Sequence, residues 1–115
     1  MTIKTITQAR DEKRIFAGVD TAHTATGACG ITAETPALTP LMIDAATGKL
    51  VVWDGQSAGT AVAVLALPLE GSETTLSYWK SGTFATESIQ WPQGVDDNKK
   101  ANAFVGSAIS HAALP

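Results

Sequence analysis

Residue types suited to catalysis or metal binding are scarce in this chain. Only one cysteine, Cys29, and two histidines, His23 and His111, occur among its 115 residues. No pair of these residues has the spacing of a metal site. A lone cysteine cannot form a disulfide within the chain, so the fold must depend on its hydrophobic core. The sequence predicts neither a metal nor any other cofactor.

Long hydrophobic runs are absent as well. The longest, Ala61–Leu69, is less than half of the roughly 20 residues needed to cross a bilayer, and Pro68 interrupts it. The first 14 residues mix threonine, glutamine and charges, where a secretory signal needs an apolar stretch of about 7–15 residues. We therefore expect no membrane insertion, and we expect the protein to stay in the cytoplasm where it is made.

Motifs for catalysis and nucleotide binding are also missing. Gly27–Gly30 is glycine-rich, but the lysine and helix of a phosphate loop do not follow it. No serine lies in a nucleophile-elbow pattern. Asp54 and Glu87 are the carboxylates closest to aromatic residues at predicted strand ends, yet nothing marks them as a pair. Because Asp54 precedes Gly55, a turn explains it better, and we expect no enzyme activity.

Charge is divided unevenly along the chain. The net charge is −3, but Met1–Arg14 carries +2 and the remaining residues carry −5. The remaining residues hold only four lysines, without the clustered lysine and arginine of a nucleic-acid-binding surface. The sequence therefore predicts a basic arm on an acidic body, with no direct contact to nucleic acid.

The first residues lack the apolar spacing of a buried helix, which predicts a mobile arm. Thr2–Thr7 is rich in β-branched residues and suits an added strand at the open edge of another sheet. Ile3 and Ile6 would face opposite sides of such a strand, so it would need burial on both faces or would be held mainly by backbone hydrogen bonds. From these residues alone, a disordered terminus is an equal alternative.

The rest of the chain has the length of one domain and enough hydrophobic residues, 44% of the whole, for a core. The ordered part is expected to begin at Ile15–Gly18, with irregular structure over Asp20–Ala33. Leu41–Asp44 and Lys49–Trp53 predict a hairpin with Gly48 in its turn. Further segments follow at the spacing of an all-β barrel or sandwich: strands over Thr60–Leu67, Thr74–Trp79 and Thr83–Trp91, with a turn at Lys80–Gly82.

One short helix is predicted near the C-terminal end, with Asp96 or Asp97 as its cap. Gly106 is expected to end or fray it. Beyond the helix, Ala108–His111 either forms a last strand or stays loose. The apolar residues of the helical segment recur at intervals of three and four: Ala101, Phe104, Val105 and Ala108.

Three tryptophans occur in this small domain: Trp53, Trp79 and Trp91. Large aromatic side chains contribute strongly both to cores and to protein interfaces. We interpret these residues as core residues first, with one or two of them available for a contact between subunits.

Five segments stand out along the chain: Ala22–Thr26, Pro36–Met42, Lys49–Gly55, Tyr78–Phe84 and Asn102–Ser110. In this order they resemble the lambdoid phage head decoration proteins. They are spread over residues 22–110 with compatible spacing, which makes the resemblance specific. Thr21 departs from the pattern, because a proline is common at that position just before Ala-His-Thr.

The resemblance implies a mainly β fold, a small β-clip-like barrel with one short C-terminal helix and a disordered N-terminal arm. Residues 1–18 would form a flexible capsid-binding arm and residues 19–115 a trimerising decoration domain. The implied function is to bind the outside of the expanded phage head as trimers and to stabilise it against internal DNA pressure. The alternative is a capsid surface module that binds host or environmental ligands.

The implied partners are the major capsid protein and further copies of the chain, on the outer capsid surface of the virion after synthesis in the host cytoplasm. His23, Thr24, Trp53 and Trp79 are candidates for capsid-facing or trimer contacts. The residues expected to bind the capsid lie in the arm: Thr2, Ile3, Lys4, Thr5, Ile6, Thr7, Arg10 and Arg14.

Overall fold

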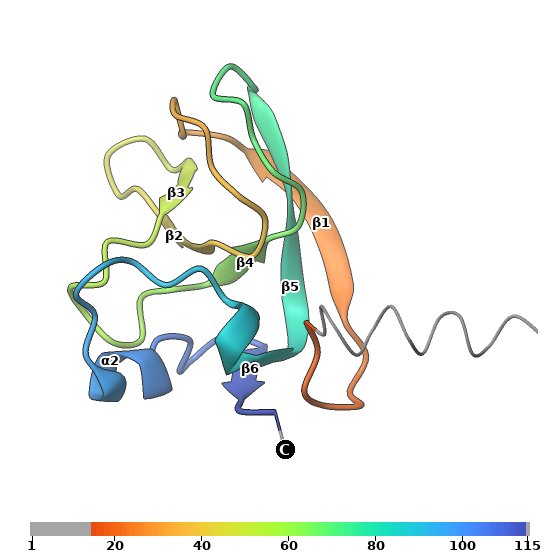
Figure 1. The fold of residues 1–115 in the computed structure, drawn as a ribbon. Coiled ribbons are helices and arrows are strands. Elements are labelled where there is room, and N and C mark those ends of the chain that lie inside the picture. The colour runs from red at the N-terminus through yellow and green to blue at the C-terminus, as the bar shows by residue number, and fades with distance from the viewer. Residues whose placement is uncertain (1–14, 115) are drawn as a thin grey trace, which may run out of the picture.

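A six-stranded sheet organises residues 15–114, the part of the chain that the computed structural model describes. A 3-10 helix, η1 (Thr86–Ser88), and a short α-helix, α2 (Asp97–Ala101), precede the last strand. The predicted mainly β fold with one short C-terminal helix is confirmed (Figure 1). The strands, in chain order, are β1 (His23–Ala28), β2 (Pro40–Ile43), β3 (Leu50–Val52), β4 (Ala63–Leu65), β5 (Thr75–Ala85) and β6 (Ile109–Ala112).

β5 is the longest strand and connects the parts of the sheet. The strand order is β1-β5-β4-β2-β3 with antiparallel neighbours, and β6 pairs in parallel with the last residues of β5. An isolated bridge joins Cys29, just after β1, to Leu50 of β3, and the Gly30 N–H donates to the Leu50 carbonyl at 2.9 Å. The two ends of the strand order therefore meet, and the sheet curls toward a small barrel.

The β2–β3 hairpin forms as predicted. Leu41 pairs with Val52, and the Asp44 N–H donates to the Lys49 carbonyl at 2.9 Å across the turn. Gly48 has a φ of +74°, which glycine adopts without the steric cost that a side chain brings. Local turn chemistry thus sets this register.

β5 contradicts the turn predicted at Lys80–Gly82. The strand continues through this segment, and Gly82 takes a φ of +128° within it. A Cβ added at Gly82 would lie 2.9 Å from the Ala22 Cβ. From Gly82 onward β5 pairs with β6, starting at Ile109, instead of with β1. The glycine therefore marks an irregularity where the strand changes partner, not a reversal of the chain.

β1 contradicts the irregular structure predicted for Asp20–Ala33. Its inward positions are small because neighbouring side chains leave little room, and a Cβ added at Gly27 would lie 2.8 Å from the Leu50 Cδ1. Thr24 and Thr26 are exposed. The small residues that suggested a loop are thus the ones that this tightly packed strand needs.

Two other strands are shorter than predicted. The segment predicted over Thr60–Leu67 is a strand only in β4, and Leu67 is 61% exposed. The segment predicted over Thr83–Trp91 stops with β5 at Ala85, where η1 begins. Length and composition located both strands but not their ends.

α2 begins as predicted and ends early. Asp96 caps it, with a side-chain oxygen that accepts a backbone N–H at 2.8 Å. The helix ends at Ala101, so Gly106 does not terminate it, and turns follow. Phe104 is buried but Val105 is 63% exposed, so the predicted apolar helix face is wrong. The last strand, which the sequence left open, forms as β6.

Two clusters of buried side chains fill the domain. β4 contributes to both, because Ala63 and Leu65 face one side of the sheet and Val64 the other. The aliphatic cluster comprises Cys29, Ile31, Leu41, Leu50, Ala63, Leu65, Leu69 and Leu76. The aromatic cluster comprises Trp53, Ala61, Val64, Phe84, Ile89, Ala103, Phe104 and Ile109, with Phe16, Trp79 and Trp91 packed against it.

Candidate functional site

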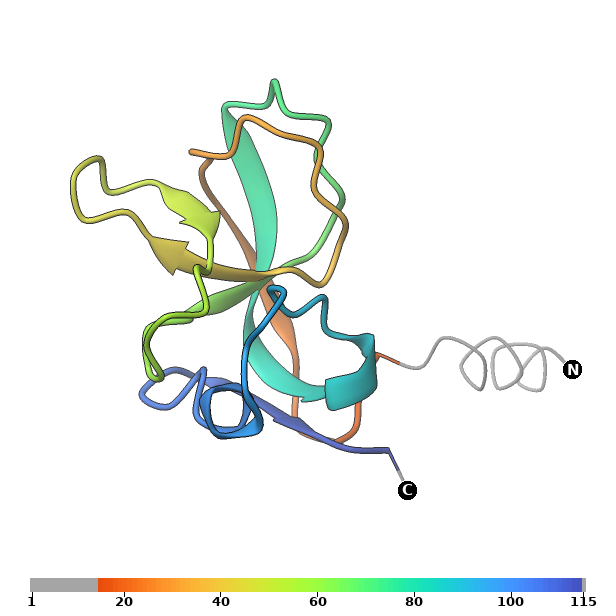
Figure 2. The ribbon, with the colours of Figure 1, turned by 60° about the vertical axis from the view of Figure 1, so that its left-hand side comes forward.

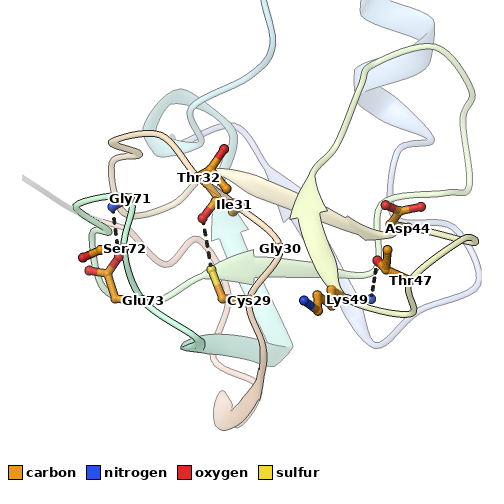
Figure 3. A pocket seen from close by; sticks show the side chains of 10 residues that line it. All are labelled: Cys29, Gly30, Ile31, Thr32, Asp44, Thr47, Lys49, Gly71, Ser72 and Glu73. Carbon is orange, nitrogen blue, oxygen red and sulfur yellow. Dashed lines mark hydrogen bonds between the residues drawn. The ribbon is translucent and has the colours of Figure 1, made fainter.

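A polar hollow of about 290 Å³ lies between the β2–β3 turn and the loop before β5 (Figure 3). The Glu73 carboxylate at its rim accepts hydrogen bonds from the N–H groups of Glu70 at 2.9 Å and Gly71 at 3.0 Å. These bonds hold the pKa of Glu73 below its ordinary value. The Thr47 hydroxyl likewise accepts the Lys49 N–H at 3.3 Å. The polar groups of the hollow are thus used to stabilise its loops.

The other chemically notable residues also serve the backbone around them. Cys29 is buried, and its Sγ donates to the Ile31 carbonyl at 3.6 Å. Asp54 accepts a turn N–H from Gln56 at 3.0 Å, and Glu87 accepts the Leu114 N–H at 3.1 Å. Among residues 15–114, no three His, Cys, Asp or Glu side chains lie together as a metal site would require. None of the helices in this range has the length and apolar character of a membrane span.

The first described residues are fixed against the end of β5. The Ala17 N–H donates to the Thr83 carbonyl at 3.0 Å, and the Ala85 N–H donates to the Ile15 carbonyl at 2.6 Å. Phe16 packs edge-on against Trp79, with ring centroids 5.4 Å apart. Residues 15–17 are therefore extended and already paired with the sheet, ahead of the domain boundary predicted after residue 18.

This end of the domain also holds η1, α2 and β6, and the described chain both begins and ends there (Figure 2). Sequence reasoning missed the residue that ties these elements together, His111 of β6. Its Nε2–H donates to the Lys100 carbonyl at 2.7 Å, because a carbonyl can only accept, and Nδ1 lies 2.7 Å from the Thr86 hydroxyl. The ring also lies 4.9 Å from that of Trp91. No spacing in the sequence signals these long-range contacts.

The predicted contact residues of the body separate into two groups. His23 and Thr24 are exposed at the start of β1, and Thr24 lies opposite half-buried Trp79 in the sheet. Trp53 instead is fully buried, and its Nε1–H donates to the Thr60 hydroxyl at 2.8 Å. With no exposed area, Trp53 is a core residue and does not belong to a contact surface.

The predicted capsid-binding residues of the arm lie outside the described residues, and their role stays a prediction. They are Thr2, Ile3, Lys4, Thr5, Ile6, Thr7, Arg10 and Arg14.

Known proteins match this chain over nearly all of its length. The family model of bacteriophage lambda head decoration protein D matches residues 5–112. The head decoration protein of Enterobacteria phage P21 is 72% identical over 115 residues, the whole of both chains. The putative decoration protein of Escherichia phage N15 is 48% identical over 106 residues, 91% of this chain and 96% of that protein. The resemblance seen in five segments of the sequence is thereby confirmed, and the chain belongs to the family of bacteriophage lambda head decoration protein D.

Proposed function

We propose that this chain binds the outside of an expanded phage head as a trimer and stabilises the head against the pressure of packaged DNA. The observation that carries the proposal is the 72% identity, over the whole chain, to the head decoration protein of phage P21. The family is one of structural proteins, which supports a binding role without catalysis. The proposed partner is the major capsid protein, and the proposed location is the outer capsid surface, reached after synthesis in the host cytoplasm.

The arm is the segment proposed to bind the head. Thr2–Thr7 has the β-branched composition of a strand and would extend the sheet of a capsid subunit through backbone hydrogen bonds. The pairing of residues 15–17 with β5 supports this role, because it fixes the point on the domain at which the arm is attached. The end of the domain that holds residues 15–17, η1, α2 and β6 is thus the end proposed to face the head.

Three arms on one trimer would bind more tightly than any one arm. Once the first arm is bound, the others are held at high effective concentration near their sites, so modest contacts combine into firm attachment. The basic residues Lys4, Arg10 and Arg14 would also attract the arm to an acidic site. Decoration should then weaken as salt rises, because ions screen charges near a protein surface.

Co-sedimentation with purified phage heads tests the proposal. The unchanged chain should sediment with expanded heads and stay in solution with unexpanded ones. A chain of the same length with residues 1–14 replaced by a glycine-serine segment should keep its circular dichroism spectrum and lose the sedimentation. Retained decoration by that folded variant would contradict the arm mechanism, and equal binding to both kinds of head would contradict specificity for the expanded one.

A further inference from the structure

One face of the β1–β5 pair is exposed over most of its length and carries no charged side chain. Residues directly opposite each other in an antiparallel pair share a face of the sheet, and here three such pairs lie in a row. Four of the six side chains are exposed, and Ser77 and Trp79 are half-buried. We call this face the β1–β5 strip: Thr24 with Trp79, Thr26 with Ser77, and Ala28 with Thr75.

The strip contains no charged residue, although the chain around it is well charged. Residues 15–114 hold nine carboxylates and four lysines, a net charge of −5. The charged residues nearest in sequence to the β5 half of the strip are Glu73, just before β5, and Lys80, just after Trp79. Depletion of charge is what distinguishes the centre of a protein interface from ordinary surface.

The strip borders an edge of the sheet with which no second strand pairs between His23 and Ala28, among residues 15–114. β1 is the last strand in the order, and between His23 and Ala28 it pairs only with β5 (Figure 1). The Cys29 N–H donates to the Thr74 carbonyl, and backbone groups alternate in direction along an antiparallel strand, so those of Thr24 and Thr26 point away from β5. Soluble proteins protect such edges with lysine, proline or acidic residues, and β1 has none of these.

We propose that the β1–β5 strip and the open edge of β1 form the contact between copies of this chain, an inference that rests on the proposed trimer. The net charge of the domain favours a second copy of this chain as the partner. Two bodies of charge −5 repel each other, and an uncharged face is where they approach at the lowest electrostatic cost. A basic partner would instead be drawn to the acidic surfaces elsewhere on the domain.

In a closed trimeric ring, a single substitution on the strip affects every contact between the copies. In such a ring each chain uses two different surfaces, so the strip of one copy contacts another surface of the next. One charge placed on the strip therefore enters all three contacts. Because Thr26 and Ala28 are exposed in the single chain, a charged side chain there remains in solvent when the chain is alone.

Three full-length variants test the inference by molar mass in analytical ultracentrifugation over a range of concentrations. Thr26→Glu and Ala28→Lys introduce charges of opposite sign on the strip. Ala45→Glu is the matched control, because Ala45 is an exposed alanine in the β2–β3 turn, away from the strip. Far-ultraviolet circular dichroism confirms that each variant is folded.

We expect both strip variants to be folded and monomeric where the unchanged chain and Ala45→Glu are trimeric, with association weakened by about 100-fold or more. Trimers formed by both folded strip variants would overturn the surface assignment and leave the proposed function intact. An unchanged chain that stays monomeric at every concentration and on heads would overturn the proposed trimer, and the inference with it.

Discussion

The two buried clusters differ in what they hold together. The aliphatic cluster joins strands that already share backbone hydrogen bonds, because its residues come mainly from the curled sheet and the loops beside it. The aromatic cluster attaches two segments that lie outside the strands, η1 and the stretch around α2, to the sheet. Trp53 and Trp91 meet edge-on within it, with ring centroids 6.3 Å apart. The attachment of η1 and α2 to the domain therefore depends on large side chains more than on strand pairing.

Among the substitutions that test the difference between the two clusters, Trp53→Ala should lower stability most. The substitution empties a fully buried site and removes the bond to Thr60, so we expect a loss of about 3–5 kcal/mol in the free energy of unfolding, measured in urea. The signal of the remaining tryptophans in near-ultraviolet circular dichroism should also weaken. A loss below about 1 kcal/mol would contradict a central role for the aromatic cluster.

Leu65→Ala makes the matching change in the aliphatic cluster. Leu65 is fully buried on β4, so its truncation should cost about 2–5 kcal/mol. Because strand pairing remains, the near-ultraviolet spectrum at low denaturant should stay that of the unchanged chain. A spectrum altered as much as in Trp53→Ala would show that the two clusters respond as one unit.

His111→Ala has a smaller expected effect. It removes the ring that bonds both Lys100 and Thr86, and we expect a loss of about 1–3 kcal/mol, because two half-buried partners lose their hydrogen bonds. His23→Ala is the control, since His23 is exposed and should change stability by no more than about 0.5 kcal/mol. Equal losses of stability in the two variants would contradict the role of His111 in attaching β6 to its neighbours.

Glu73→Gln should have the smallest effect, visible only through its dependence on pH. The lowered pKa of Glu73 means that its charged form favours the folded state. Its contribution is therefore present above pH 4.5, the ordinary pKa of the side chain, and is lost as pH falls through the lower pKa of the folded state. The unchanged chain should be the more stable of the two near neutral pH, and the difference in urea midpoint should shrink in acid. A difference that grows in acid would contradict this sign.

The sequence predicted the parts of the fold that depend on neighbouring residues. The β2–β3 hairpin and the Asp96 cap follow from turn and capping chemistry within a few residues. β1 was missed because the glycine at position 27 reflects a tertiary contact: the Leu50 side chain leaves no room for a larger residue. Gly82 was misread because a change of strand partner and a turn have the same local sequence signal.

The candidate site was predictable to a similar extent. The family, and with it the proposed capsid-binding role of the arm, followed from collinear segments of sequence. The contacts of His111 and the burial of Trp53 depend on residues brought together only by folding. The uncharged β1–β5 strip could not be read from the sequence either, because its two halves are separated by the whole β2–β4 region.

A single proline in the arm tests the central claim most directly. If Thr2–Thr7 adds a strand to a capsid subunit's sheet, Thr5→Pro should sharply reduce co-sedimentation with expanded heads, because proline lacks the backbone N–H and fits poorly in a sheet. Thr5→Ala keeps that N–H and should sediment nearly as well as the unchanged chain. Equal decoration by Thr5→Pro, Thr5→Ala and the unchanged chain would contradict a grip made by backbone pairing.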